Sequence, residues 1–296
     1  MSRKKCISGP PNRNSGSGAR VQSSMRIALA LVPLAVAAAQ PPDPSEIIRR
    51  SLTANEQNWA AARNYTFLQR TEERRVDSAG RVKSKNIKTY DITLLEGSPY
   101  LRLVEREDRP LPAAEERREQ EKLQKSIADR QKETPAQRQR RIAEYEKRRD
   151  RQRQDMRQVG EAFNFRIVGT DRLDGHDVWV LDATQRRGYK PNSSDTKVLP
   201  HVKGKLWIDQ HTFHWVRVEA EVTDPVTWGL FLVRLDPGAR IRIDETLVNH
   251  EVWLPRQISI SASARIGLFK KLRVEEDTTY RNYRKFQTDS RMIASQ

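Results

Sequence analysis

Short runs in which apolar and polar residues alternate recur along most of this 296-residue sequence. Alternation with a period of two is typical of β-strands that present one face to a core and the other to water. Turn-forming residues separate the runs, as in Asp77-Ser78-Ala79-Gly80 and Leu173-Asp174-Gly175-His176. About ten strands are predicted, at residues 65–69, 90–94, 101–103, 165–168, 178–181, 206–208, 213–222, 228–233, 241–248, 258–260 and 268–274.

These runs predict one large antiparallel sheet, and a sheet of so many strands has to curl to cover its apolar face. The fold class is therefore α+β, mainly β, with a single domain over residues 40–296. The polar segment Tyr189–Pro200 contains Pro191 and a run of Asn and Ser residues, and it is predicted to be a long loop.

A helix is predicted ahead of the first strand. Pro41-Pro42-Asp43-Pro44 forms a linker, and Ser45 is a suitable helix cap. Apolar residues then follow at the spacing of one helix face for about four turns. The members of this stripe are Ile47, Ile48, Leu52, Asn55 and Trp59.

Residues 110–160 differ from the rest of the chain because charged residues and Gln dominate and large apolar residues are sparse. Thr134-Pro135-Ala136-Gln137 combines a cap, a first-turn proline and a Gln three residues after the cap, which indicates a helix start. We predict a long charged helical hairpin inserted in the domain. It is either a solvated insertion without a function of its own or a docking arm or lid.

The first 39 residues predict export. They contain six basic residues and no acidic one. After Met25-Arg26, the apolar run Ile27–Val36 ends in Ala37-Ala38-Ala39, which is the pattern of a signal peptide over about residues 25–39. A retained anchor is the alternative, but a bilayer span takes about 20 residues. Translation is predicted to begin at Met25.

Cysteine usage refines this prediction. The one cysteine, Cys6, falls in the leader, so disulfides and thiolate metal sites are not expected in the mature chain. A lipoprotein signal needs a Cys after its apolar run, and none is present here. We therefore predict a periplasmic protein that is not a lipoprotein.

The sequence does not indicate an enzyme, a cofactor or a metal. It has no phosphate-binding glycine loop, no Gly-x-Ser-x-Gly elbow and no His-Glu-x-x-His helix. His211-x-x-His214 lies close to Asp209, but residues 209–212 are predicted to form a tight turn in which polar side chains serve solvation. His176, His201 and His250 have no catalytic partner that the sequence reveals.

Large aromatic residues on the predicted strands indicate a different kind of site. They either fill the core or line a partly open apolar cavity, because one amphipathic helix is little cover for so long a sheet. The aromatic residues are Trp207, Trp215, Trp228, Phe231, Trp253 and Phe269. The predicted cavity wall consists of Trp207, Trp228, Phe231, Ile243, Trp253, Ile258 and Ile260.

Three motifs carry a family resemblance. Lys203-Gly204-Lys205-Leu206-Trp207-Ile208-Asp209, then Val216-Arg217-Val218, then Trp253-Leu254-Pro255 occur in an order that resembles the LolA-like outer-membrane lipoprotein-sorting superfamily, which includes LolA, LolB, RseB and LppX. The resemblance covers about residues 45–108 and 163–286. It implies an open half-barrel of antiparallel strands around helices, with a hydrophobic cavity that receives acyl chains.

Three hypotheses follow for the function. The first is a periplasmic carrier or chaperone that binds acyl chains of lipids or lipoproteins. The second is a non-enzymatic envelope sensor or scaffold whose helical hairpin binds a partner protein. The third is a basic surface that binds a membrane or nucleic acid, although interleaved acids and export argue against nucleic acid. The basic surface of this third hypothesis consists of Arg138, Arg140, Arg141, Lys147, Arg148, Arg149, Arg151 and Arg153.

Overall fold

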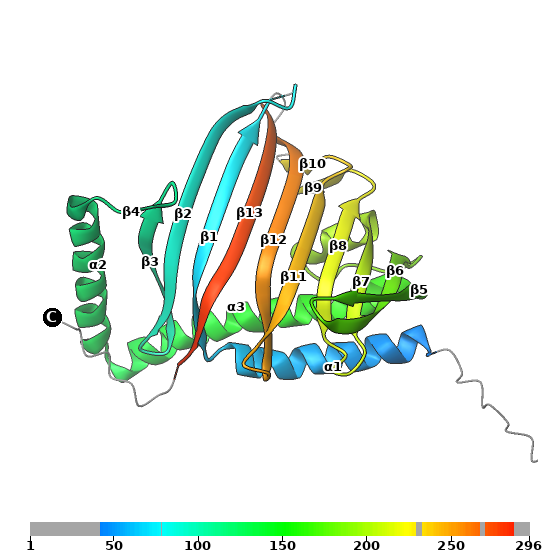
Figure 1. Ribbon diagram of the computed structural model, residues 1–296, viewed down its shortest axis with the longest axis horizontal. Helices are drawn as coiled ribbons and strands as arrows, with labels where there is room; N and C mark the ends of the chain where they lie inside the picture. Colours follow the sequence, from blue (N-terminus) through cyan, green and yellow to red (C-terminus); the bar gives the residue numbers. More distant parts are fainter. Residues whose placement is uncertain (1–41, 78, 229–232, 267–269, 287–296) are drawn as a thin grey trace, which may run out of the picture. The chain divides into compact units, whose positions relative to one another are not determined.

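Thirteen antiparallel strands form one open sheet in the computed structural model, which describes residues 42–77, 79–228, 233–266 and 270–286 (Figure 1). Eleven of them lie in the order β4-β3-β2-β1-β13-β12-β11-β8-β7-β6-β5, and β9 and β10 pair beside β12. The predicted α+β, mainly β fold class is confirmed. The predicted leader at residues 1–39, Cys6, Phe231 and Phe269 lie outside the described residues.

The first four strands form a meander. They are β1 (Tyr65–Val76), β2 (Val82–Leu95), β3 (Ser98–Arg106) and β4 (Arg109–Pro110). Between β1 and β2 the Asp77 carboxylate accepts hydrogen bonds from the main-chain N–H groups of Ala79 and Arg81, each at 2.9 Å. This is the turn that the sequence predicted.

The remaining strands follow the insertion. They are β5 (Phe163–Leu173), β6 (His176–Gln185), β7 (Val202–Asp209), β8 (Trp215–Val222), β9 (Val226–Trp228), β10 (Val233–Leu235), β11 (Arg240–Val248), β12 (Val252–Ile266) and β13 (Lys270–Lys285). Asp174 and Gly175 adopt φ of 50° and 88° in the predicted β5–β6 turn, as expected for an Asp-Gly hairpin. β13 pairs with both β12 and β1 and so joins the two halves of the sheet.

The helix α1 (Pro44–Ala62) begins two residues earlier than a cap at Ser45 predicts. The predicted cap at Ser45 is wrong, because Asp43 is the cap and its carboxylate accepts the Ser45 N–H at 3.0 Å. Pro44 then occupies the first helical position, where its missing N–H costs nothing. Ile47 and Ile48 are buried against the sheet.

Two further helices form the predicted insertion. They are α2 (Ala113–Gln131) and α3 (Pro135–Ala162). The capping box predicted at Thr134 and Gln137 is present. Figure 1 shows that α2 stands beside β3, whereas α3 runs across the strands, so the two helices diverge after their turn. α2 has no buried residue.

The predicted loop at residues 189–200 is partly wrong, because it includes a 3₁₀-helix, η1 (Asp195–His201), which packs against α3. Thr196 of η1 is buried, and its hydroxyl bonds with the Ser193 hydroxyl at 3.0 Å. Short polar side chains of this kind stabilise a tight turn through local hydrogen bonds. None of the described helices is long and apolar enough to cross a membrane.

Two neighbouring apolar clusters fill one face of the sheet from β5 to β8, and Val159 and Phe165 pack against both. One contains Ile47, Ile48, Leu181, Leu206, Ile208 and Trp215; the other contains Ala162, Phe163, Ala183, Val202, Val222, Val226 and Ala239. We call this face the helix-side face, because α1 and α3 cover it, and we call the other the open face. Trp215 is tied to α1 by a 3.0 Å hydrogen bond from its indole Nε1 to the Ser51 hydroxyl.

Candidate functional site

Strand register places part of the predicted cavity wall on the helix-side face. Leu206, which belongs to the apolar cluster on the helix-side face, pairs with Val218. Val218 in turn pairs with Ile243, and Ile243 pairs with Ile258. Directly opposed residues of an antiparallel sheet point to the same face. Ile243 and Ile258 therefore share the face of Leu206.

The next row of the same face extends this apolar surface. Ile241 pairs with Ile260, and both lie two residues from the previous pair and so on the same side of their strands. We call Ile241, Ile243, Ile258 and Ile260 the isoleucine patch. Three of its members belong to the predicted wall, and Ile241 was missed although its alternation with Arg240 and Arg242 indicates the same face.

The isoleucine patch is half-buried and belongs to neither apolar cluster of its face. β12 begins at Val252 beside α1 and rises beyond the crossing helices (Figure 1). Ile258 and Ile260 lie roughly 20 and 26 Å along it. On β13 the same rows continue with Thr278 and Glu276. The patch is therefore the apolar margin of the covered core, bordered by polar side chains.

The aromatic residues of the predicted cavity wall lie away from the isoleucine patch. Trp207 and Trp253 are buried at 9% and 5% exposure in a cluster with Val178, Val180 and Val216. Trp228 packs on the apolar cluster that contains Phe163 and Val226. Its indole Nε1 donates a hydrogen bond to the Ser194 carbonyl at 3.1 Å. The structure thus brings together the isoleucines and separates them from the tryptophans.

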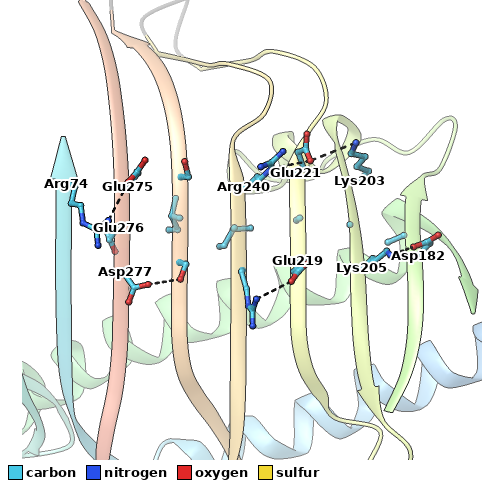
Figure 2. Close-up of a pocket in the computed structure, with 18 of the residues that line it drawn as sticks. Arg74, Asp182, Lys203, Lys205, Glu219, Glu221, Arg240, Glu275, Glu276 and Asp277 are labelled. Atoms are coloured by element: carbon cyan, nitrogen blue, oxygen red, sulfur yellow. Dashed lines mark hydrogen bonds and ion pairs between the residues drawn. The ribbon is translucent and has the colours of Figure 1, made fainter. Parts of the chain in front are cut away.

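The open face carries a charged trough of about 710 Å³ (Figure 2). Its side chains stand in two rows across β6, β7, β8, β11, β12, β13 and β1, and the main chain between them forms the floor. One row is Lys203, Glu221, Arg240, Ser261, Glu275 and Arg74; the other is Asp182, Lys205, Glu219, Arg242, Ser259, Asp277 and Glu72.

Opposite charges alternate across neighbouring strands of the charged trough from β6 to β11. Serines stand on β12, and beyond it Asp277 of β13 lies opposite another acid, Glu72 of β1. Lys205 lies 3.8 Å from Asp182, and Arg240 lies 3.4 Å from Glu221. Such cross-strand pairs contribute less than about 1 kcal/mol each at an exposed surface. Because an acyl chain here would strip water from charged groups, the trough is unsuited to an apolar ligand.

Asp244 connects the charged trough to the buried tryptophans. Its carboxylate is 3% exposed and accepts hydrogen bonds from Arg217 Nε at 2.6 Å and Arg242 Nε at 2.7 Å. Burial raises the pKa of Asp244, but the hydrogen bonds from both arginines outweigh burial and hold this pKa below its ordinary value. The Arg217 guanidinium lies 5.6 Å from the centre of the Trp207 ring.

Two histidines flank Trp253. The ring centre of His176 lies 4.7 Å from that of Trp253, and His214 stacks on the indole at 5.4 Å with an angle of 11°. His214 Nε2 lies 2.7 Å from a Glu245 oxygen, and His176 Nδ1 lies 3.1 Å from an Asp209 oxygen. The sequence did not reveal these partners, because they are more than 30 residues away in the chain.

The turn after β7 is structural, so its predicted role in solvation alone is wrong. Asp209 is 1% exposed, and its carboxylate accepts the N–H groups of His211 and Thr212 at 3.0 and 2.6 Å. Burial raises the pKa of Asp209, but the hydrogen bonds from Thr212 and His211 outweigh burial and lower it. Among the described residues, no group of three or more His, Cys, Asp or Glu side chains is arranged to hold a metal ion.

Comparison with solved structures gives matches to proteins of the group that the sequence resembles. An outer membrane lipoprotein-sorting protein domain from Vibrio parahaemolyticus is 11% identical over 82% of this chain and 95% of that chain, with a TM-score of 0.35. A LolA superfamily protein from Nitrosomonas europaea is 11% identical over 86% and 99%, with a TM-score of 0.31. The Pseudomonas aeruginosa MucA/MucB complex gives 12% identity over 83% and 100%, with a TM-score of 0.23.

No family model matches the sequence, and no curated protein matches it. All three structural matches have TM-scores below 0.5. The function is therefore inferred from the residues of this chain.

Proposed function

We propose that the protein is an exported, non-enzymatic carrier that binds acyl chains of lipids or lipoproteins on the isoleucine patch. The observation that supports this proposal is the partial exposure of Ile241, Ile243, Ile258 and Ile260 side by side on one face, outside both apolar clusters. Contiguous apolar surface at the margin of a core is a typical binding surface. The leader, proposed to be a signal peptide, places the carrier in the periplasm.

The chemistry of the isoleucine patch fits an acyl chain better than a polar ligand. Each methylene that leaves water contributes about 0.8 kcal/mol, so six methylenes on the patch contribute roughly 5 kcal/mol. Thr278 and Glu276 on β13 border the patch on one side. No reactive side chain is needed for this role.

Native mass spectrometry and organic extraction of the exported protein, purified without detergent, test the proposal. Co-purified lipid or acylated protein supports it, and a clean apo mass that also fails to bind an added fluorescent fatty acid overturns it. The double variant Ile243→Ser and Ile258→Ser removes contacts to about two ligand methylenes and weakens fatty-acid binding by roughly tenfold.

The matched control changes aliphatic side chains elsewhere in the same sheet. Val82 and Leu101 are 54% and 53% exposed on β2 and β3. Replacing both by Ser makes the same kind of change and leaves fatty-acid binding unaltered. Equal weakening in the two double variants would assign binding to general surface hydrophobicity instead of the isoleucine patch.

A second candidate function is that of a scaffold whose insertion binds a partner protein. It is supported by α2, a 19-residue helix with no buried residue. Because α3 contributes Met156 and Val159 to the core, whereas α2 buries no residue, replacement of α2 leaves the apolar core intact. A Gly/Ser linker of equal length reaches roughly 24 Å and suits this replacement. Loss of a co-purifying protein with fatty-acid binding retained would favour the scaffold.

A further inference from the structure

The outward surface of α3 carries a line of cations. Arg140, Lys147, Arg148 and Arg151 are all exposed, and we call them the basic stripe. Their spacing of seven, one and three residues places them within about 100° of arc on the helix. The line extends about 16 Å along the helix axis.

The other cations of α3 that the sequence grouped with these four are engaged within the protein. Arg141 pairs with Glu133 at 2.6 Å, and Arg138 lies 3.6 Å from Glu96. Arg149 donates to the Trp59 carbonyl at 2.7 Å. Arg153 pairs with Asp150.

Within the part of the chain that the structure describes, the basic stripe differs from these residues because its side chains make no ion pair and no hydrogen bond. Glu144 is the one acidic residue that lies among the four on the same arc. The stripe therefore keeps most of its positive charge available to a ligand.

Comparison with α2 shows that this arrangement is specific to α3. α2 carries five cationic and five anionic side chains, whereas α3 carries nine and five. Both helices are equally rich in charge, and both are largely exposed. Solubility alone does not require the excess on one of them, since α2 achieves the same exposure with balanced charge.

We propose that the basic stripe docks the protein on an anionic lipid surface, with α3 lying along the plane of the headgroups. Lys and Arg side chains near such a surface gain about 1 kcal/mol each through electrostatics alone, without an apolar anchor. The stripe offers no such anchor, because no apolar residue between Arg140 and Arg151 falls on the same arc of the helix. Protein interfaces instead centre on buried aromatic or aliphatic side chains.

The charge and length of the basic stripe set its expected behaviour. A protein surface with four such cations binds anionic vesicles roughly 100- to 1,000-fold more tightly than the same surface without them. Attraction of this kind acts within the Debye length, which shortens from about 10 Å at 0.1 M salt to about 3 Å at 1 M. Binding is therefore released by salt and does not depend on an acyl ligand on the isoleucine patch.

Sedimentation with vesicles tests the proposal on the exported protein as purified, with all variants prepared identically. The vesicles contain phosphatidylglycerol and phosphatidylcholine, and pure phosphatidylcholine vesicles are the reference. The test variant changes Arg140, Lys147, Arg148 and Arg151 to Gln. The control variant changes Arg117, Arg118, Lys122 and Lys125 of α2 to Gln, which alters the net charge equally.

The expected result is that the wild-type protein and the α2 variant sediment with anionic vesicles at 0.1 M salt, and that the basic-stripe variant binds at least 100-fold more weakly. Thermal melts of all three proteins establish that each is folded. Equal loss in both variants, no loss in the stripe variant, or no binding of the wild-type protein would overturn the proposal. Retention of the wild-type protein on immobilised polyglutamate but not on vesicles would assign the stripe to an acidic protein and overturn membrane docking.

Discussion

Replacement of Asp244 by Asn tests how strongly the open face depends on one buried carboxylate. The change keeps the shape of the side chain and removes the charge that accepts hydrogen bonds from Arg217 and Arg242. Loss of one partner of a buried ion pair costs about 3–5 kcal/mol. Arg242 is 45% exposed and recovers part of its hydration, so we expect a loss of about 2–3 kcal/mol at pH 7.

Urea unfolding followed by tryptophan fluorescence measures this loss, because Trp207 lies beside Arg217. The melting temperature falls in parallel by about 5–10 °C for a chain of this size. Glu219→Gln is the matched control. Its partner Arg242 lies 3.7 Å away, and both side chains are more than 40% exposed, so the expected cost is below about 0.5 kcal/mol.

The dependence on pH provides the stricter test. The folded-state pKa of Asp244 lies below its ordinary value of 3.8, so the folded protein binds a proton here less readily than the unfolded chain. The stability from this group is therefore complete above the unfolded pKa and is lost as pH falls through the folded pKa. The difference between wild type and Asp244→Asn should be constant from pH 7 to 5 and shrink below about pH 4. A difference under 1 kcal/mol at pH 7, or one that does not shrink in acid, would refute this reasoning.

Three further substitutions test other parts of the fold. Gly204→Ala places a Cβ 2.5 Å from the Glu219 carbonyl oxygen and should lower unfolding free energy by about 1–3 kcal/mol in urea titration; unchanged stability would contradict the strand spacing. Asn58→Ala removes two hydrogen bonds to the Trp253 main chain, at 2.7 and 2.8 Å. It should cost about 2–3 kcal/mol in the same titration, and a wild-type value would mean that α1 is not held to β12 in this way. Thr134→Ala removes the cap of α3 and should speed amide exchange in its first turn roughly fivefold; unchanged exchange would argue against the capping box.

The strands show where local sequence is sufficient. Alternation predicted most of the strands, because a residue's exposure in a two-sided sheet depends on parity along its own strand. The Asp-Gly turn and the Thr134 capping box were predicted for the same reason, since their hydrogen bonds and dihedral angles lie within a few residues. The cap of α1 was assigned to Ser45 instead of Asp43 because both residue types accept N–H hydrogen bonds equally well.

The candidate site shows where local sequence is insufficient. Alternation placed Ile243, Ile258 and Ile260 among the apolar positions, but only the register between β11 and β12 sets them beside Ile241. The tryptophans looked equivalent to these isoleucines because hydrophobicity carries no information about which cluster a side chain joins.

The kind of most elements and the parity of the predicted strands could be read from the amino-acid sequence, because these follow from interactions within a few residues. Three features needed the folded chain: β13 joins β1 to β12, His214 meets Glu245, and some cations of α3 remain without partners in the described residues. Those pairings join residues from 31 to more than 200 positions apart, and they depend on the packing of the whole sheet.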